Sequence, residues 1–76
     1  MIYYVIIATA VSVAGGDVID RSSLRSHQFP TLAMCEEARA KPFVEFMERM
    51  RMDSVGVARD SYKVVTACVE VREQHS

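Results

Sequence analysis

The sequence has almost no net charge and few glycines, and each shortage excludes a class of function. Nine basic and ten acidic residues leave a formal charge of −1, so the basic excess that captures nucleic acid is missing. None of the three glycines belongs to a phosphate-binding loop, since no Lys-Ser or Lys-Thr follows Gly15-Gly16. We therefore expect no direct nucleic-acid binding.

Cysteine and histidine are too scarce and too scattered for a metal or redox site. Cys35 and Cys68 lack the two-residue spacing of a redox pair, and adding His27 and His75 gives no zinc-ligand spacing. Cys35 beside His27 would be the basis of a small cysteine-dependent enzyme, but the sequence marks no orienting carboxylate or oxyanion donor. We expect no metal, no cofactor, no catalytic residue and no enzymatic activity.

A long hydrophobic run occupies the amino terminus. It is shorter than the roughly 20 apolar residues that span a bilayer, and no Lys or Arg precedes it as in a signal peptide. Its Tyr, Val, Ile and Thr residues favour a β-strand. We expect a buried strand and no membrane partner, with an uncleaved membrane or export signal as the alternative.

The 76 residues make one compact domain, spanning 1–76. Alternation, turn and capping signals predict strands over 2–13, 17–29 and 62–71, and a helix over 32–40 that kinks or breaks near Pro42 and continues to 52. Val55 and Val57 predict a short extra strand in the connection 53–61. The polar end of the chain, 72–76, is expected to fray.

The first strand is apolar on both faces, which is typical of a central strand. Gly15-Gly16 predicts a tight hairpin into the second strand, and the polar middle of that strand suits a sheet edge. The last strand can then lie antiparallel on the other side of the first. We predict an α+β fold with a three-stranded antiparallel sheet, ordered second–first–third and covered on one face by the helix.

The two cysteines can meet if the helix covers the sheet, because Cys35 lies on the helix and Cys68 on the last strand. A disulfide closing a loop of about 34 residues would contribute roughly 3–4 kcal/mol of stability. The alternative is a pair of reduced cysteines in the core, where each acts as a small hydrophobic residue.

One helical layer covers only one face of a three-stranded sheet, so the other face should expose apolar side chains. Such a patch usually marks an interface, either of a symmetric homodimer or with a foreign partner. The connection 53–61 or the tail could also fold over it. The even-numbered residues Tyr4, Ile6 and Ala8 could form this face, but we take the odd-numbered set as the candidate interface: Tyr3, Val5, Ile7, Val65, Ala67 and Val69.

The second half of the helical region has an amphipathic pattern. Its apolar residues recur at positions i, i+3, i+4 and i+7, namely Phe43, Phe46, Met47 and Met50. Charged residues fill the other side: Glu45, Glu48, Arg49 and Arg51.

Several segments together resemble small phage, prophage and proteobacterial proteins of unknown function. The matching features are the short apolar first strand, the Gly15-Gly16 turn, the segment 29–39 (Phe-Pro-Thr through Cys-Glu-Glu-Ala-Arg) and the segment 64–69 (Val-Val-Thr-Ala-Cys-Val). The resemblance implies paired cysteines and a strand–strand–helix–strand fold, and it carries over no catalytic residue. In size and in its lack of a site, the chain is also similar to anti-CRISPR proteins, which inhibit host defences by occluding a surface.

We therefore expect a non-enzymatic protein-binding module. The leading hypothesis is a phage-type inhibitor of a host defence complex such as CRISPR–Cas, acting in the cytoplasm of a bacterial host cell. An alternative is a small exported domain of the periplasm, stabilised by a disulfide. The small cysteine-dependent enzyme is the second alternative.

Overall fold

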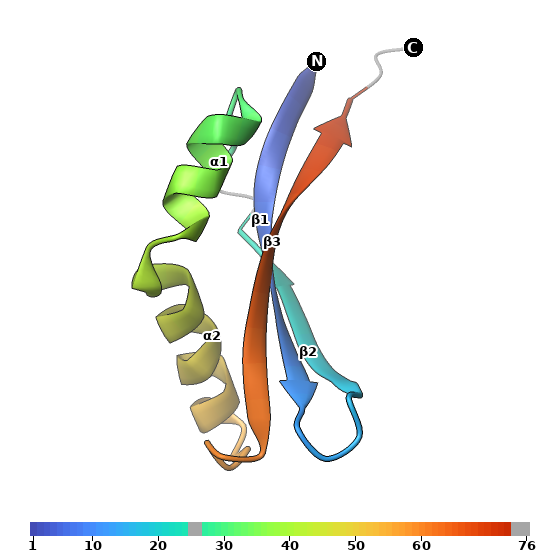
Figure 1. Cartoon of the computed structure of the whole chain (residues 1–76), viewed down its shortest axis with the longest axis vertical. Helices are drawn as coiled ribbons and strands as arrows, with labels where there is room; N and C mark the ends of the chain where they lie inside the picture. Colours follow the sequence, from blue (N-terminus) through green and yellow to red (C-terminus); the bar gives the residue numbers. More distant parts are fainter. Residues whose placement is uncertain (25–26, 74–76) are drawn as a thin grey trace.

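A computed structural model of the chain describes residues 1–24 and 27–73. Its elements, in chain order, are β1 (Ile2–Ser12), β2 (Val18–Ser23), α1 (Leu32–Arg39), α2 (Pro42–Ser54) and β3 (Tyr62–Arg72). The strands form one antiparallel sheet in the order β2-β1-β3, with both helices along one side (Figure 1). The predicted α+β class, strand order and central first strand are confirmed.

The central strand β1 pairs with β3 along its whole length, from Ile2 opposite Arg72 to Ser12 opposite Tyr62. The hairpin from β1 to β2 closes where the Ser12 N–H donates to the carbonyl oxygen of residue 17 over 2.8 Å. Gly16 has a φ of +72° there, a conformation that glycine adopts without a steric penalty. The apolar amino-terminal run is thus a strand that is paired on both sides.

β2 stops at Ser23, before the predicted end of the second strand at residue 29. The N–H of His27 donates to the carbonyl oxygen of Leu24 over 3.1 Å, so this N–H adds no rung to the sheet. Phe29 then returns to β1 through an isolated antiparallel bridge. The prediction of one strand through 29 is therefore wrong at its end, and its residues 25–26 lie outside the described residues.

The helical region consists of two separate helices. Thr31 caps α1 as predicted, since its Oγ1 accepts the Met34 N–H over 3.2 Å. α1 ends at Arg39, and Pro42 opens α2 in its first turn, where a missing N–H costs no helical hydrogen bond. The predicted break near Pro42 is confirmed.

The connection after α2 contains no strand, so the predicted extra strand at Val55 and Val57 is wrong. α2 itself runs to Ser54, slightly beyond its predicted end. The Val55 N–H then bonds the Arg51 carbonyl oxygen over 3.3 Å, which extends the helical turn through the position expected to start a strand. Gly56, with a φ of +81°, reverses the chain.

The core lies between the helices and the even-numbered side chains of β1. One buried cluster contains Ile6, Ala8, Cys35 and Val44. A second, near the carboxyl end of α2, contains Ala10, Met52 and Tyr62. The helical layer therefore covers one face of the sheet, and the odd-numbered side chains lie on the other face.

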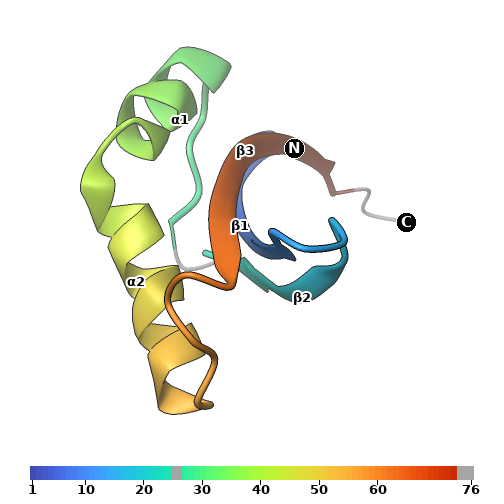
Figure 2. The same ribbon diagram turned by 60° about the horizontal axis from the view of Figure 1, so that its bottom comes forward.

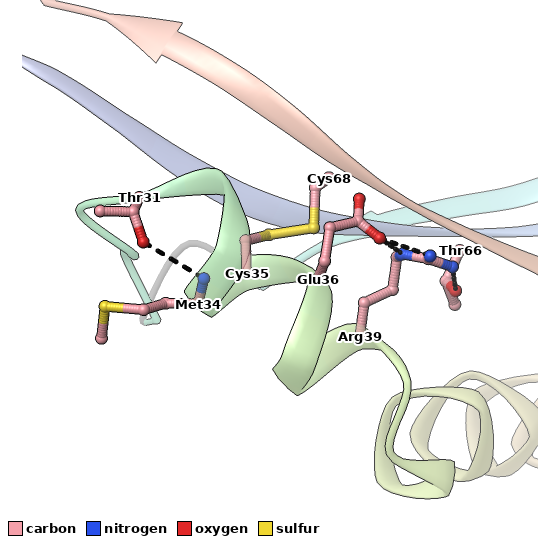
Figure 3. Close-up of a disulfide and its surroundings, with 7 residues drawn as sticks. All are labelled: Thr31, Met34, Cys35, Glu36, Arg39, Thr66 and Cys68. Carbon is pink, nitrogen blue, oxygen red and sulfur yellow. Dashed lines mark hydrogen bonds and ion pairs between the residues drawn. A yellow bond between two sulfur atoms is a disulfide. The ribbon is translucent and has the colours of Figure 1, made fainter.

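A disulfide joins the layers where α1 crosses β3 (Figure 3). Cys35 and Cys68 are bonded, with their Cα atoms 6.2 Å apart, which confirms their predicted proximity. One turn further along α1, the Arg39 guanidinium pairs with Glu36 and donates to Thr66 Oγ1 of β3 over 3.5 Å. The helix is thus held to the sheet by a covalent bond and a neighbouring polar contact.

Reduction of the Cys35–Cys68 bond is expected to lower the free energy of unfolding by about 3–4 kcal/mol, because the open chain gains conformational entropy. Denaturant titration of the wild-type protein with and without a thiol reductant measures this difference. The Cys35→Ala/Cys68→Ala variant is the control, and the reductant should leave its midpoint unchanged. Equal midpoints for oxidised and reduced wild-type protein would contradict the prediction.

Candidate functional site

The uncovered face of the sheet is concave. Figure 2 shows that the sheet curls away from the helices, so that the outer strands rise on either side of β1. A hollow of about 400 Å³ lies on this face, and it is lined by Tyr3, Val5, Ile7, Arg21, Ser23, Val69 and Val71. We call this surface the concave face.

Strand register explains why these side chains converge. Tyr3 lies opposite Val71 and Val5 opposite Val69, while Ile7 is flanked by Ser23 on β2. Because directly opposed residues of antiparallel strands share a face, each pair points into the hollow. The curl brings the flanking strands around Val5, which is only 4% exposed although no helix covers it.

The candidate interface residues fall into two groups in the structure. Tyr3, Val5, Ile7 and Val69 line the hollow, whereas Val65 and Ala67 are exposed further along β3, outside its lining. The predicted interface did not include three residues that also line the hollow: Val71 of β3, and Arg21 and Ser23 of β2. Strand alternation alone could not place Arg21 and Ser23, because the bulge between Ala10 and Val11 shifts the register of β2.

Arg21 is the charged residue in the lining of the hollow, and no described carboxylate forms an ion pair with it. It lies opposite Thr9, on the hollow side of β2. Within residues 1–24 and 27–73, every other arginine forms an ion pair with a carboxylate, namely Arg39, Arg49, Arg51, Arg59 and Arg72. Arg21 forms none with a described residue, so its guanidinium is available to a bound carboxylate.

A second apolar surface lies on the outer side of α2. Phe43, Phe46, Met47 and Met50 are 58%, 59%, 39% and 56% exposed, and we call these four residues the α2 stripe. An amphipathic helix normally turns such a stripe toward the core. Here the buried residues of α2 are instead Val44, Glu48 and Met52.

Polar residues of β2 explain this orientation. Asp20 and Ser22 lie opposite the buried Ala10 and Ala8, so they point toward the helical layer. The Arg51 guanidinium of α2 donates to both carboxylate oxygens of Asp20, over 3.1 and 3.2 Å. Ser22 donates a hydrogen bond to Glu48 of α2. These contacts hold the charged side of α2 toward the sheet.

Glu48 is the charged residue at the centre of the buried side of α2. It is 1% exposed, and its Oε1 accepts a hydrogen bond from Ser22 Oγ over 2.9 Å. Arg51 Nε lies 3.7 Å from the same oxygen, and Oε2 has no hydrogen-bond partner among the described residues. Burial raises the pKa of Glu48, and the nearby Asp20 carboxylate raises it further. Hydrogen bonds from Arg51 lower the pKa of Asp20.

The cysteines and histidines considered as catalytic or metal-binding residues do not form a cluster in the described part of the chain. The Cys35 sulfur is bonded to Cys68 and so is no free thiolate in this state. His27 borders a small apolar hollow of about 120 Å³, beside Phe29 and Lys41. No three His, Cys, Asp or Glu side chains of residues 1–24 and 27–73 meet at one point, and His75 lies outside those ranges.

The basic residues near the end of α2 are each neutralised, apart from Lys63. Arg49 pairs with Glu45 over 2.8 Å, and Arg59 pairs with Asp53 over 2.8 Å. Arg51 is held by Asp20, as described above. Among the described residues, the three arginines at this end of the molecule are therefore each paired with a carboxylate.

Comparison of the chain with protein-family models, with curated proteins and with solved structures found no match. Neither of the two described helices has the length and hydrophobicity needed to cross a membrane.

Glu48→Gln is expected to stabilise the protein by about 1 kcal/mol at pH 7, because it removes a buried charge while keeping an acceptor for Ser22. The raised pKa of Glu48 means that the wild-type protein loses stability as pH rises above the unfolded-state value. The advantage of the variant should therefore shrink below about pH 4.5, where the carboxyl is protonated in both states.

Denaturant titrations from pH 3 to pH 8 measure this difference. Glu45→Gln, an exposed change on the same helix, is the matched control, and its effect should stay within about 0.5 kcal/mol. Destabilisation by Glu48→Gln at pH 7 would contradict the assignment of Glu48 as a charge that costs stability.

Proposed function

We propose that this chain is a non-enzymatic protein-binding module whose partner occupies the concave face. The observation that carries the proposal is the apolar hollow formed by three strands, which no other described part of the chain covers. Its lining residue Val69 is 38% exposed, and apolar surface that stays open to solvent marks an interaction site in many proteins. The Cys35 sulfur is bonded to Cys68 and cannot act as a nucleophilic thiolate in that state, which also supports binding over cysteine-based catalysis.

The shape and charge of the concave face favour a partner of definite character. A concave surface fits a convex element, such as a helix or a protruding loop, better than a second copy of itself. Its apolar floor would receive apolar side chains. Arg21 is at the β2 side of the hollow and has no ion-pair partner within residues 1–24 and 27–73, so it would pair with an Asp or Glu of that element.

Two settings would use such a module. As a phage-type inhibitor it would occlude a surface of a host defence complex, such as CRISPR–Cas, in the cytoplasm. As an exported domain it would act in the periplasm. The Cys35–Cys68 disulfide favours the exported setting, because structural disulfides are rare in the reducing cytosol and persist outside it.

Val69→Asp is expected to abolish partner binding, because it places a carboxylate in the apolar floor of the hollow. Val65→Asp is the matched control, since Val65 is on the same strand and sheet face but outside the lining. Each protein is used as bait in cells of its native host, and direct binding of the captured partner is then measured with purified components. A partner lost equally from both variants, or from neither, would contradict binding at the hollow.

The exported setting predicts that the two cysteines are oxidised in the cell and that the protein is released with the periplasm. Cell fractionation after rapid alkylation of free thiols measures both properties at once. A cytoplasmic protein with two alkylated cysteines would contradict this setting and favour the inhibitor of a cytoplasmic complex, leaving the concave-face proposal itself intact.

A further inference from the structure

The concave face has opposite charges at its two ends. At one end, Arg21 lies beside Thr9 of β1 and forms no ion pair with a described residue. At the other end, the Tyr3 hydroxyl donates to Oε1 of Glu73 over 3.1 Å, which places this carboxylate at the rim of the hollow. The lining between the two ends is mainly apolar, namely Val5, Ile7, Val69 and Val71.

The Glu73 carboxylate is the counterpart of Arg21, since no described cation forms an ion pair with it. The amino-terminal ammonium of Met1 bonds the backbone carbonyl oxygen of Glu73 over 3.1 Å, not its side chain. The acidic residues of the three strands, Asp20 and Glu70, lie on the helical side of the sheet, and each pairs with an arginine. A partner in the hollow therefore meets a cation at one end and an anion at the other.

The separation of these two charges sets the length of a partner that pairs with both. Tyr3 and Thr9, which mark the two ends, are six positions apart on β1, or about 20 Å at the rise of a strand. A helix rises about 1.5 Å per residue, so it covers this distance in about 13 residues. Helical residues about 11 or 14 positions apart lie on the same side, three or four turns from each other.

The shape of the concave face favours a helix over an extended segment. The outer strands of a three-stranded sheet are about 10 Å apart, and a helix with its side chains is about as wide. The sheet curls around a space of this width (Figure 2). An extended segment binds through the hydrogen bonds of an edge strand, whereas the floor of the hollow is a sheet face centred on β1.

We propose that the partner element is an amphipathic helix of about three to four turns, with its apolar stripe on the floor of the hollow and opposite charges at its ends. An Asp or Glu near one end pairs with Arg21, and a Lys or Arg near the other end pairs with Glu73. The apolar contact supplies most of the affinity, while the two ion pairs set the direction in which the helix lies. This inference rests on the proposed function and specifies the partner of the same surface.

A displayed library of amphipathic helical peptides of about 18 residues, selected on the purified protein, tests the inference. One stripe of each peptide is randomised among apolar residues, and the positions beside it among acidic, basic and neutral polar residues. Enriched peptides should have an acid and a base about 11 or 14 positions apart beside the stripe, and circular dichroism should show that they are helical when bound. No enrichment, or enrichment without this spacing, would overturn the proposal.

Charge exchange then tests each ion pair with one synthetic selected peptide, whose affinity is measured by fluorescence anisotropy. Arg21→Glu is expected to weaken binding about 10-fold and Glu73→Lys, at the rim, about threefold, because each places like charges together. Exchange of the peptide's acid for lysine should restore binding to Arg21→Glu, and exchange of its base for glutamate should restore binding to Glu73→Lys. The matched controls Lys41→Glu and Glu70→Lys, on the helical side, should change the affinity by less than about twofold.

The Val69→Asp variant separates this inference from the proposed function, and circular dichroism verifies that every variant is folded. If Val69→Asp loses the peptide while the charge exchanges neither weaken nor restore binding, the concave face binds a partner but the paired charges are overturned. A peptide that binds Val69→Asp as tightly as wild type lies outside the hollow and also overturns the inference. The proposed function is then still decided by the captured partner.

Discussion

The attachment of the helical layer to the sheet through Cys35 and Cys68 is the constraint on which the rest of the structure depends. α1 has eight residues, and a helix of that length is not stable alone. In the described part of the chain, two small clusters of buried side chains lie beneath the helices, as expected for a domain of this size. The disulfide fixes α1 on β3, which in turn sets the position from which α2 starts at Pro42.

Much of the fold could be predicted because strong local signals agree with one topology. The amino-terminal run is apolar at both odd and even positions. A strand of this kind has two apolar faces, which favours a central position in the sheet. The Gly15-Gly16 hairpin then predicted that β2 pairs with β1. The two cysteines indicated that the helix packs against β3. The same alternation predicted that Tyr3, Val5, Ile7 and Val69 share a face, and in the structure these four line the hollow.

The orientation of α2 could not be predicted from the same signals. Hydrophobic periodicity locates an apolar stripe on a helix, but it does not say which side meets the sheet. That choice depends on Asp20 and Ser22 of β2, which bond Arg51 and Glu48 across the layers. Those contacts require the register of β2, and a bulge makes that register unreadable from the sequence. The sheet curl, and with it the hollow, is likewise a property of the assembled strands.

The curl of the sheet also has a consequence for the outer edge of β3. In the order β2-β1-β3, one side of this strand of eleven residues has no neighbour among the strands that the structure describes. A long, flat and apolar edge is a template on which further chains can add, strand by strand, into fibrous aggregates. A curved edge matches a second edge over only a short length, so few hydrogen bonds can form between them. The curvature that shapes the concave face thereby protects the protein against polymerisation.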